Sequence, residues 1–139
     1  MKYFKIALIS FCLSSLTAYA LTDSFLKMVS IGGPKSLDEA FVLLEKADAT
    51  ESDELSVAIE KSILKAPKSF LKTLKKHKPA GKGLDSVVAT FKQIKNNDSE
   101  AKIKEIQLRI DALKSVSDQD LQVLRDQCIL TLENKVKHL

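Results

Sequence analysis

The sequence predicts an all-α protein built from six to seven antiparallel amphipathic helices. Beyond residue 20, apolar residues recur at spacings of three and four, which is the period of a helix with one buried face. Strictly alternating apolar and polar runs, which indicate half-buried strands, are hard to find. Only four Gly and three Pro interrupt the chain. We therefore expect either a compact helical bundle or a short solenoid of helix pairs.

The first twenty residues have the features of a secretory signal peptide. Lys2 and Lys5 provide a positive start, residues 6–16 form an apolar run, and residues 18–20 read Ala-Tyr-Ala, a small-x-small cleavage signal. The run is far shorter than the roughly 20 residues that span a bilayer. An uncleaved anchor, or lipidation at Cys12, is the alternative. We expect cleavage after residue 20 and an exported protein, periplasmic in a Gram-negative bacterium and otherwise secreted, with residues 21–139 as one domain.

The first helices are predicted from their start and stop signals. A short helix over residues 23–29 should end at the Gly-Gly-Pro of residues 32–34, which is a strong helix breaker. Ser36 and Glu39 have the spacing of a capping box, so we expect Ser36 to open the second helix.

The middle of the chain should hold three more helices. Residues 50–53 look like a helix start, and Pro67 marks the end of that helix and the first turn of the next. The Pro-Ala-Gly-Lys-Gly run of residues 79–83 should stop the fourth helix. Residues 84–94 then predict a fifth helix.

The last two helices have the clearest apolar stripes. One should begin near Asp98 or Ser99, and Ser117 should cap the other. Short connections favour antiparallel neighbours, and helices of about this length also suit a HEAT-like solenoid by architectural analogy. The two stripes are Ile103, Ile106, Ile110 and Leu113, and Leu121, Leu124, Cys128, Leu132 and Val136.

Charge is segregated along the chain. Loss of Lys2 and Lys5 with the signal lowers the formal net charge from +4 to about +2, so overall basicity is modest. Residues 38–60 nevertheless form an acidic block with one lysine, and residues 61–84 contain lysines and no acid. One interpretation is that both blocks are solvated helix faces that attract each other. The other is that the lysine block is a surface that binds an anionic partner.

The lysine block supplies the candidate binding residues. Lysine steers an acidic partner diffusely, whereas arginine grips phosphates and bases, and Phe70 alone offers no stacking platform for nucleic acid. We therefore expect a protein partner with an acidic surface and no nucleic acid. A membrane surface is the less favoured alternative, because the helix also resembles an interfacial helix in outline. The candidate residues are Lys68, Lys72, Lys75, Lys76, Lys78 and Lys82.

Motifs that carry catalysis are missing. His77 and His138 are expected to be solvated, the carboxylates to lie at exposed helix positions and caps, and no pair of His or Cys has zinc-ligand spacing. Cys128 should be a small buried hydrophobe, although an odd cysteine in an exported protein also raises an intermolecular disulfide. We expect no enzyme, cofactor or metal. The preferred function is an exported protein-binding module of the inhibitor, immunity or envelope-accessory type, and the alternative is a structural protein that associates with membrane or cell wall; the oligomeric state stays open.

Overall fold

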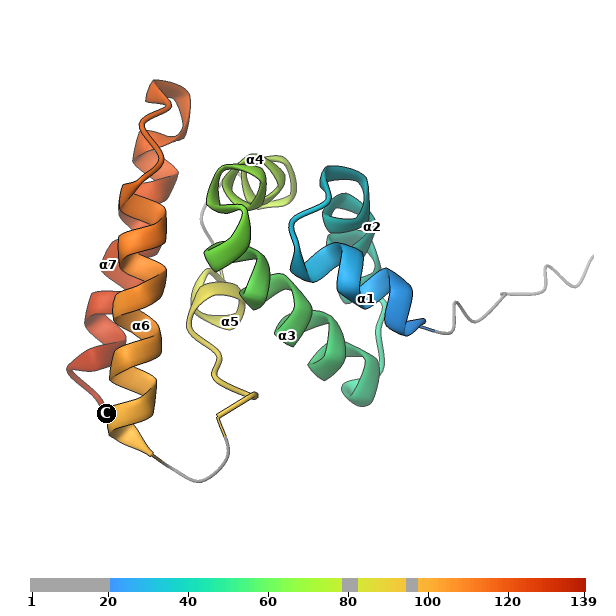
Figure 1. The fold of residues 1–139 in the computed structure, drawn as a ribbon, viewed down its shortest axis with the longest axis horizontal. Helices are drawn as coiled ribbons and strands as arrows, with labels where there is room; N and C mark the ends of the chain where they lie inside the picture. Colours follow the sequence, from blue (N-terminus) through green and yellow to red (C-terminus); the bar gives the residue numbers. More distant parts are fainter. Residues whose placement is uncertain (1–20, 79–82, 95–97) are drawn as a thin grey trace, which may run out of the picture.

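The computed structural model describes residues 21–78, 83–94 and 98–139, and every regular element in these ranges is helical. This confirms the all-α prediction (Figure 1). The twenty residues of the expected signal peptide and Lys82 lie outside the described residues. The elements are α1 (Asp23–Ser30), α2 (Pro34–Leu44), α3 (Ala49–Lys65), α4 (Pro67–His77), α5 (Asp85–Val88), α6 (Ser99–Lys114), the 3₁₀ turn η1 (Gln119–Leu121) and α7 (Gln122–Val136).

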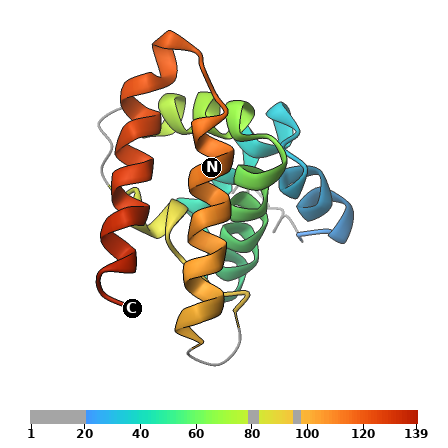
Figure 2. The same cartoon turned by 60° about the vertical axis from the view of Figure 1, so that its left-hand side comes forward.

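The helices form a bundle organised around α3. This helix packs against α1, α2, α4, α5 and α6, while α6 and α7 make an antiparallel hairpin at the side of the molecule (Figures 1 and 2). In a solenoid each repeat contacts only its neighbours in sequence. Contact of one central helix with elements from both halves of the chain makes this a bundle, with one contiguous apolar core.

Two helix starts differ from the sequence expectation. α2 begins at Pro34, with Gly33 at its N-cap, so the predicted Ser36 capping box is wrong. Proline is preorganised for the first helical position and starts the helix two residues earlier. α3 is capped by Asp48, whose carboxylate accepts from the Glu51 N–H at 2.9 Å, and the Glu51 side chain accepts from the Asp48 N–H at 3.3 Å. The capping box therefore stands at α3.

The second half of the chain contains two further corrections. The helix expected over residues 84–94 is only the four-residue α5. Ser117 does not cap the final helix; Asp118 stands at the N-cap of η1, and α7 begins after that turn. The start of α6 is confirmed, because the Asp98 carboxylate accepts from the Ala101 N–H at 3.0 Å.

Most of the predicted apolar stripes face the core. In α7 the stripe is buried except at half-buried Val136. In α6, Ile106, Ile110 and Leu113 are buried, but Ile103 is 42% exposed. The α6 face that meets the core includes Arg109, which lies three residues after Ile106 and is completely buried.

Candidate functional site

The α4 helix separates an apolar face from a lysine face. Phe70, Leu71 and Leu74 are completely buried in the core. The candidate lysines at positions 68, 72, 75 and 76 are exposed, and Lys78 is half-buried. The structure thus places four of the six candidate residues on α4 and Lys78 directly after it.

Acidic residues of the α6–α7 connection pair with two of these lysines. The Lys68 ammonium lies 2.8 Å from the Asp118 carboxylate, and this hydrogen bond lowers the pKa of Asp118 and raises the pKa of Lys68. The Lys75 ammonium donates to the Asp120 carbonyl at 2.9 Å and lies 3.5 Å from the Asp120 carboxylate. Part of the α4 charge is therefore offset by the chain itself.

Asp38 of α2 offsets a third lysine and binds His77. The Lys76 ammonium lies 2.7 and 2.8 Å from the two Asp38 carboxylate oxygens, and His77 Nε2 lies 2.7 Å from one of them. The hydrogen bond from Lys76, followed by that from His77, lowers the pKa of Asp38. His77 also stacks on Phe41, with ring centroids 5.4 Å apart.

The expectation of two solvated histidines is therefore wrong for His77, whose side chain is 14% exposed, while His138 is exposed. The physical reason is that α2 and α4 pack together, so that Asp38 meets Nε2 at the edge of the imidazole and Phe41 stacks on its face.

Lys72 is the exposed α4 lysine that keeps its charge unpaired among the described residues. Its field adds to the lowering of the pKa of Asp118, after the larger contributions of Lys68. The two blocks do attract each other through Lys76 and Asp38, as one sequence interpretation suggested, but two other partners come from beyond both blocks.

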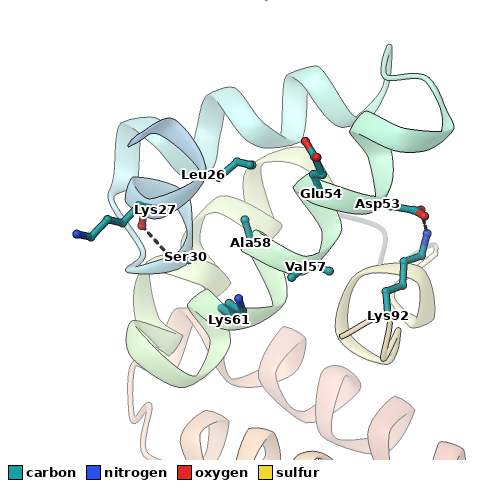
Figure 3. Close-up of a pocket in the computed structure, with 9 residues that line it drawn as sticks. All are labelled: Leu26, Lys27, Ser30, Asp53, Glu54, Val57, Ala58, Lys61 and Lys92. Atoms are coloured by element: carbon teal, nitrogen blue, oxygen red, sulfur yellow. Dashed lines mark hydrogen bonds and ion pairs between the residues drawn. The ribbon is translucent and has the colours of Figure 1, made fainter. Parts of the chain in front are cut away.

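A groove between α1 and α3 is a second candidate surface, which sequence reasoning missed. It is an open cavity of about 470 Å³, shown in Figure 3. This volume falls within the range of about 300–1,000 Å³ that is usual for ligand sites. Its lining residues are Leu26, Lys27, Ser30, Asp53, Glu54, Val57, Ala58, Lys61 and Lys92.

The groove has an apolar floor and charged edges. Leu26 reaches from α1 toward α3, where Val57 and Ala58 complete the floor (Figure 3). An ion pair between Lys92 and Asp53 closes one end. Lys61 is exposed and forms no ion pair with a described residue.

Two further charged residues, Lys27 and Glu54, line the groove. Lys27 extends to the side of α1 away from α3 (Figure 3), and it too has no ion-pair partner among the described residues. Glu54 is exposed on α3. The sequence did contain one sign of this groove: Leu26 and Val57 are apolar residues on otherwise charged helix surfaces. In the structure both are half-buried. Their proximity depends on how two helices some thirty residues apart pack.

A buried ionic cluster joins α3 to α6. Glu60 and Arg109 are both completely inaccessible to solvent, and the guanidinium lies 3.0 Å from the Glu60 carboxylate. The same guanidinium lies 3.1 Å from the Glu105 carboxylate, whose side chain is largely buried. The expectation that the carboxylates lie at exposed positions is therefore wrong for Glu60.

Arg109 also binds the backbone at the end of α5. Its guanidinium donates to the backbone carbonyls of Val88 at 2.8 Å and of Thr90 at 3.3 Å, and lies 4.9 Å from the centre of the Phe91 ring. In a continuing helix these carbonyls would accept from backbone N–H groups four residues later. Here α5 ends at Val88, and Arg109 supplies hydrogen-bond donors to these two carbonyls.

Burial raises the pKa of Glu60 to about 7, against the lowering effect of Arg109 and with a smaller contribution from the Glu105 charge. Glu60 Oε1 and Thr90 Oγ1 are buried without a hydrogen-bond partner among the described residues. The ordinary aqueous stabilisation of a carboxylate is therefore missing at Glu60.

Cys128 is buried, and burial raises the pKa of its thiol to about 12. The thiol is thus protonated at neutral pH and behaves as the small hydrophobe that was expected. Within the described ranges, His, Cys, Asp and Glu side chains do not gather in a group that could hold a metal ion. In the same ranges no helix has the length and hydropathy needed to cross a membrane.

Comparisons of the chain with protein-family models, with curated proteins and with solved structures found no match.

Proposed function

We propose that this chain is an exported, non-catalytic helical module that binds a protein with an acidic surface, as inhibitor, immunity and envelope-accessory proteins do. The observation that carries the proposal is the α1–α3 groove, where an apolar floor lies beside the ammonium of Lys61, which has no ion-pair partner among the described residues. Apolar anchors that fill a pocket supply most of the binding energy at protein interfaces, and charges at the rim steer association.

Lysines without an acidic partner among the described residues indicate the steering surface better than the lysine block as a whole. Lys68, Lys75 and Lys76 already have acidic partners, so their field at a distance is weak. Lys61 and Lys72 have no such partner among the described residues. The steering charge should therefore come mainly from such lysines, which also include exposed Lys65 in the block and Lys27 at the groove.

A structural role at a membrane or cell wall, through the lysine-rich helix, is the competing function. An interfacial helix buries its apolar face in the lipid headgroup region. In α4 the three large apolar side chains, Phe70, Leu71 and Leu74, are in the protein core. Insertion would require that helix to leave the bundle, which favours the protein partner over lipid.

The export expectation has a separate test. N-terminal sequencing of protein recovered from the cell envelope or the medium should give Leu21 as the first residue. Recovery of a cytosolic protein with Met1 retained would contradict the compartment and the choice of partner class.

Binding is tested by affinity capture from an envelope extract with tagged mature protein, followed by mass spectrometry. The Lys61→Glu and Val57→Ser variants should lose the captured protein, because they change the groove's charge and its apolar floor. The matched control is Lys76→Glu, which alters an already paired lysine. Thermal unfolding of each variant checks that the fold is intact.

The captured complex should also weaken with salt, since the Debye length falls from about 10 Å at 0.1 M to about 3 Å at 1 M. A complex that survives Lys61→Glu but is lost in Lys76→Glu would move the binding surface to α4. Sedimentation of the protein with anionic, but not neutral, vesicles would favour the membrane function instead.

A further inference from the structure

The buried cluster contains one more acid than base. If all three side chains were ionised, Glu60 and Glu105 would place two negative charges around the single positive charge of Arg109. Glu60 is completely buried, and one of its oxygens has no partner among the described residues. An excess charge in such a place is costly, because water does not reach it and Arg109 donates to only one of the two Glu60 oxygens.

A proton on Glu60 would remove this excess. The cluster would then contain one guanidinium and one carboxylate, Glu105, whose side chain is only 16% exposed and 3.1 Å from Arg109. Glu60 Oε2 would still accept the hydrogen bond from Arg109 at 3.0 Å. The proton would turn Oε1, which has no partner among the described residues, into a hydrogen-bond donor. The Thr90 hydroxyl is also buried without a described partner, and the Arg109 guanidinium donates to the Thr90 carbonyl.

We propose that Glu60 is a buried proton-binding site, and that its protonation controls the stability of the contact between α3 and α6. The charged groups facing it are Arg109 and Glu105 from α6 and Lys92 from the segment after α5. Arg109 and Lys92 favour ionisation of Glu60, whereas Glu105 and the exclusion of water oppose it, and burial is the largest of these influences.

The direction of the pH effect follows from the raised pKa, about 7 in the folded protein against 4.5 for an ordinary glutamate. Between these two values the folded protein holds the proton and the unfolded chain does not, so unfolding releases it. The free energy of unfolding therefore falls as the pH rises through this interval and levels off above it.

The test compares wild-type protein with Glu60→Gln, a neutral side chain of the same shape. We expect the unfolding equilibrium constant of the wild type, measured with urea, to rise by roughly 10- to 100-fold between about pH 5 and pH 8 relative to that of Glu60→Gln. Glu54→Gln, on the exposed side of the same helix, is the matched control and should keep the wild-type pH dependence.

A second measurement does not depend on the variant's folding. Titration of the Glu60 side-chain carbon by NMR in the wild-type protein should show a midpoint near pH 7. The proposal is overturned by a midpoint below about pH 5, the range of an ordinary glutamate. It is also overturned if a folded Glu60→Gln variant keeps the full pH dependence of the wild type.

Discussion

Replacing Arg109 with methionine should be among the most damaging single changes in this protein. Methionine replaces the stem of arginine with an unbranched side chain, but it ends short of the guanidinium position and donates no hydrogen bond. The change removes the ion pairs to Glu60 and Glu105 and both bonds to the backbone around Val88 and Thr90. Because Glu60 is completely buried, its carboxylate would keep no compensating charge in contact.

The expected magnitude follows from this burial. Removing one partner of a buried ion pair costs about 3–5 kcal/mol, and a buried carbonyl left without a donor costs about 1–3 kcal/mol more. The total is a large part of the 5–15 kcal/mol that is typical for a domain's stability. The loss should be greater at about pH 8 than at about pH 5, because a protonated Glu60 tolerates the apolar surroundings.

Urea unfolding followed by circular dichroism measures this loss. Arg125→Met is the matched control, because Arg125 is only half-buried and its long-range bond is to a single carbonyl, that of Val116. We expect that control to cost about 1 kcal/mol. In the double variant Arg109→Met with Glu60→Leu, much of the loss should be recovered, since a buried pair replaced by apolar residues is often neutral.

The reasoning would be refuted if Arg109→Met cost less than the Arg125 control. It would also be refuted if the double variant lost as much stability as the two single variants together, because the two side chains would then contribute independently.

Further expected outcomes concern the core, the turns and the caps. Leu124→Ala should cost about 2–5 kcal/mol in urea unfolding and Lys114→Ala almost nothing, because Leu124 is buried and Lys114 is exposed; equal effects would mean that α7 does not pack as described. Gly32→Ala should lower the melting temperature more than Gly83→Ala. Both glycines have positive φ, 80° and 70°, but an added Cβ at Gly32 collides with the α3–α4 junction while that at Gly83 meets ordinary contacts. Asp48→Ala should cost about 1 kcal/mol by removing the capping box of α3, and Asp48→Asn, which preserves a capping oxygen, should retain most of that stability.

Local patterns account for the parts of the fold that were predicted correctly. α1, α4 and α6 begin close to their expected positions because caps and proline act within one turn of the chain. The Ser36 cap failed for a related reason: Pro34 offers a competing start two residues earlier. Four of the candidate lysines lie on α4 and Lys78 directly follows it, but the acids that pair with three of them could not be identified from spacing.

The sequence by itself determined the helical class, the core stripe of α7 and most of that of α6, because these depend on a period of 3.6 residues that every segment carries locally. Only the tertiary structure decided where charge is buried. Glu60 and Arg109 are 49 positions apart, and each looks like an ordinary solvated residue on a charged helix. Their burial depends on α3 packing against α6, and the same packing brings Arg109 to the Val88 carbonyl at the end of α5. A charged side chain such as Arg109 can be buried on a core-facing helix position when other helices supply its hydrogen-bond and ion-pair partners.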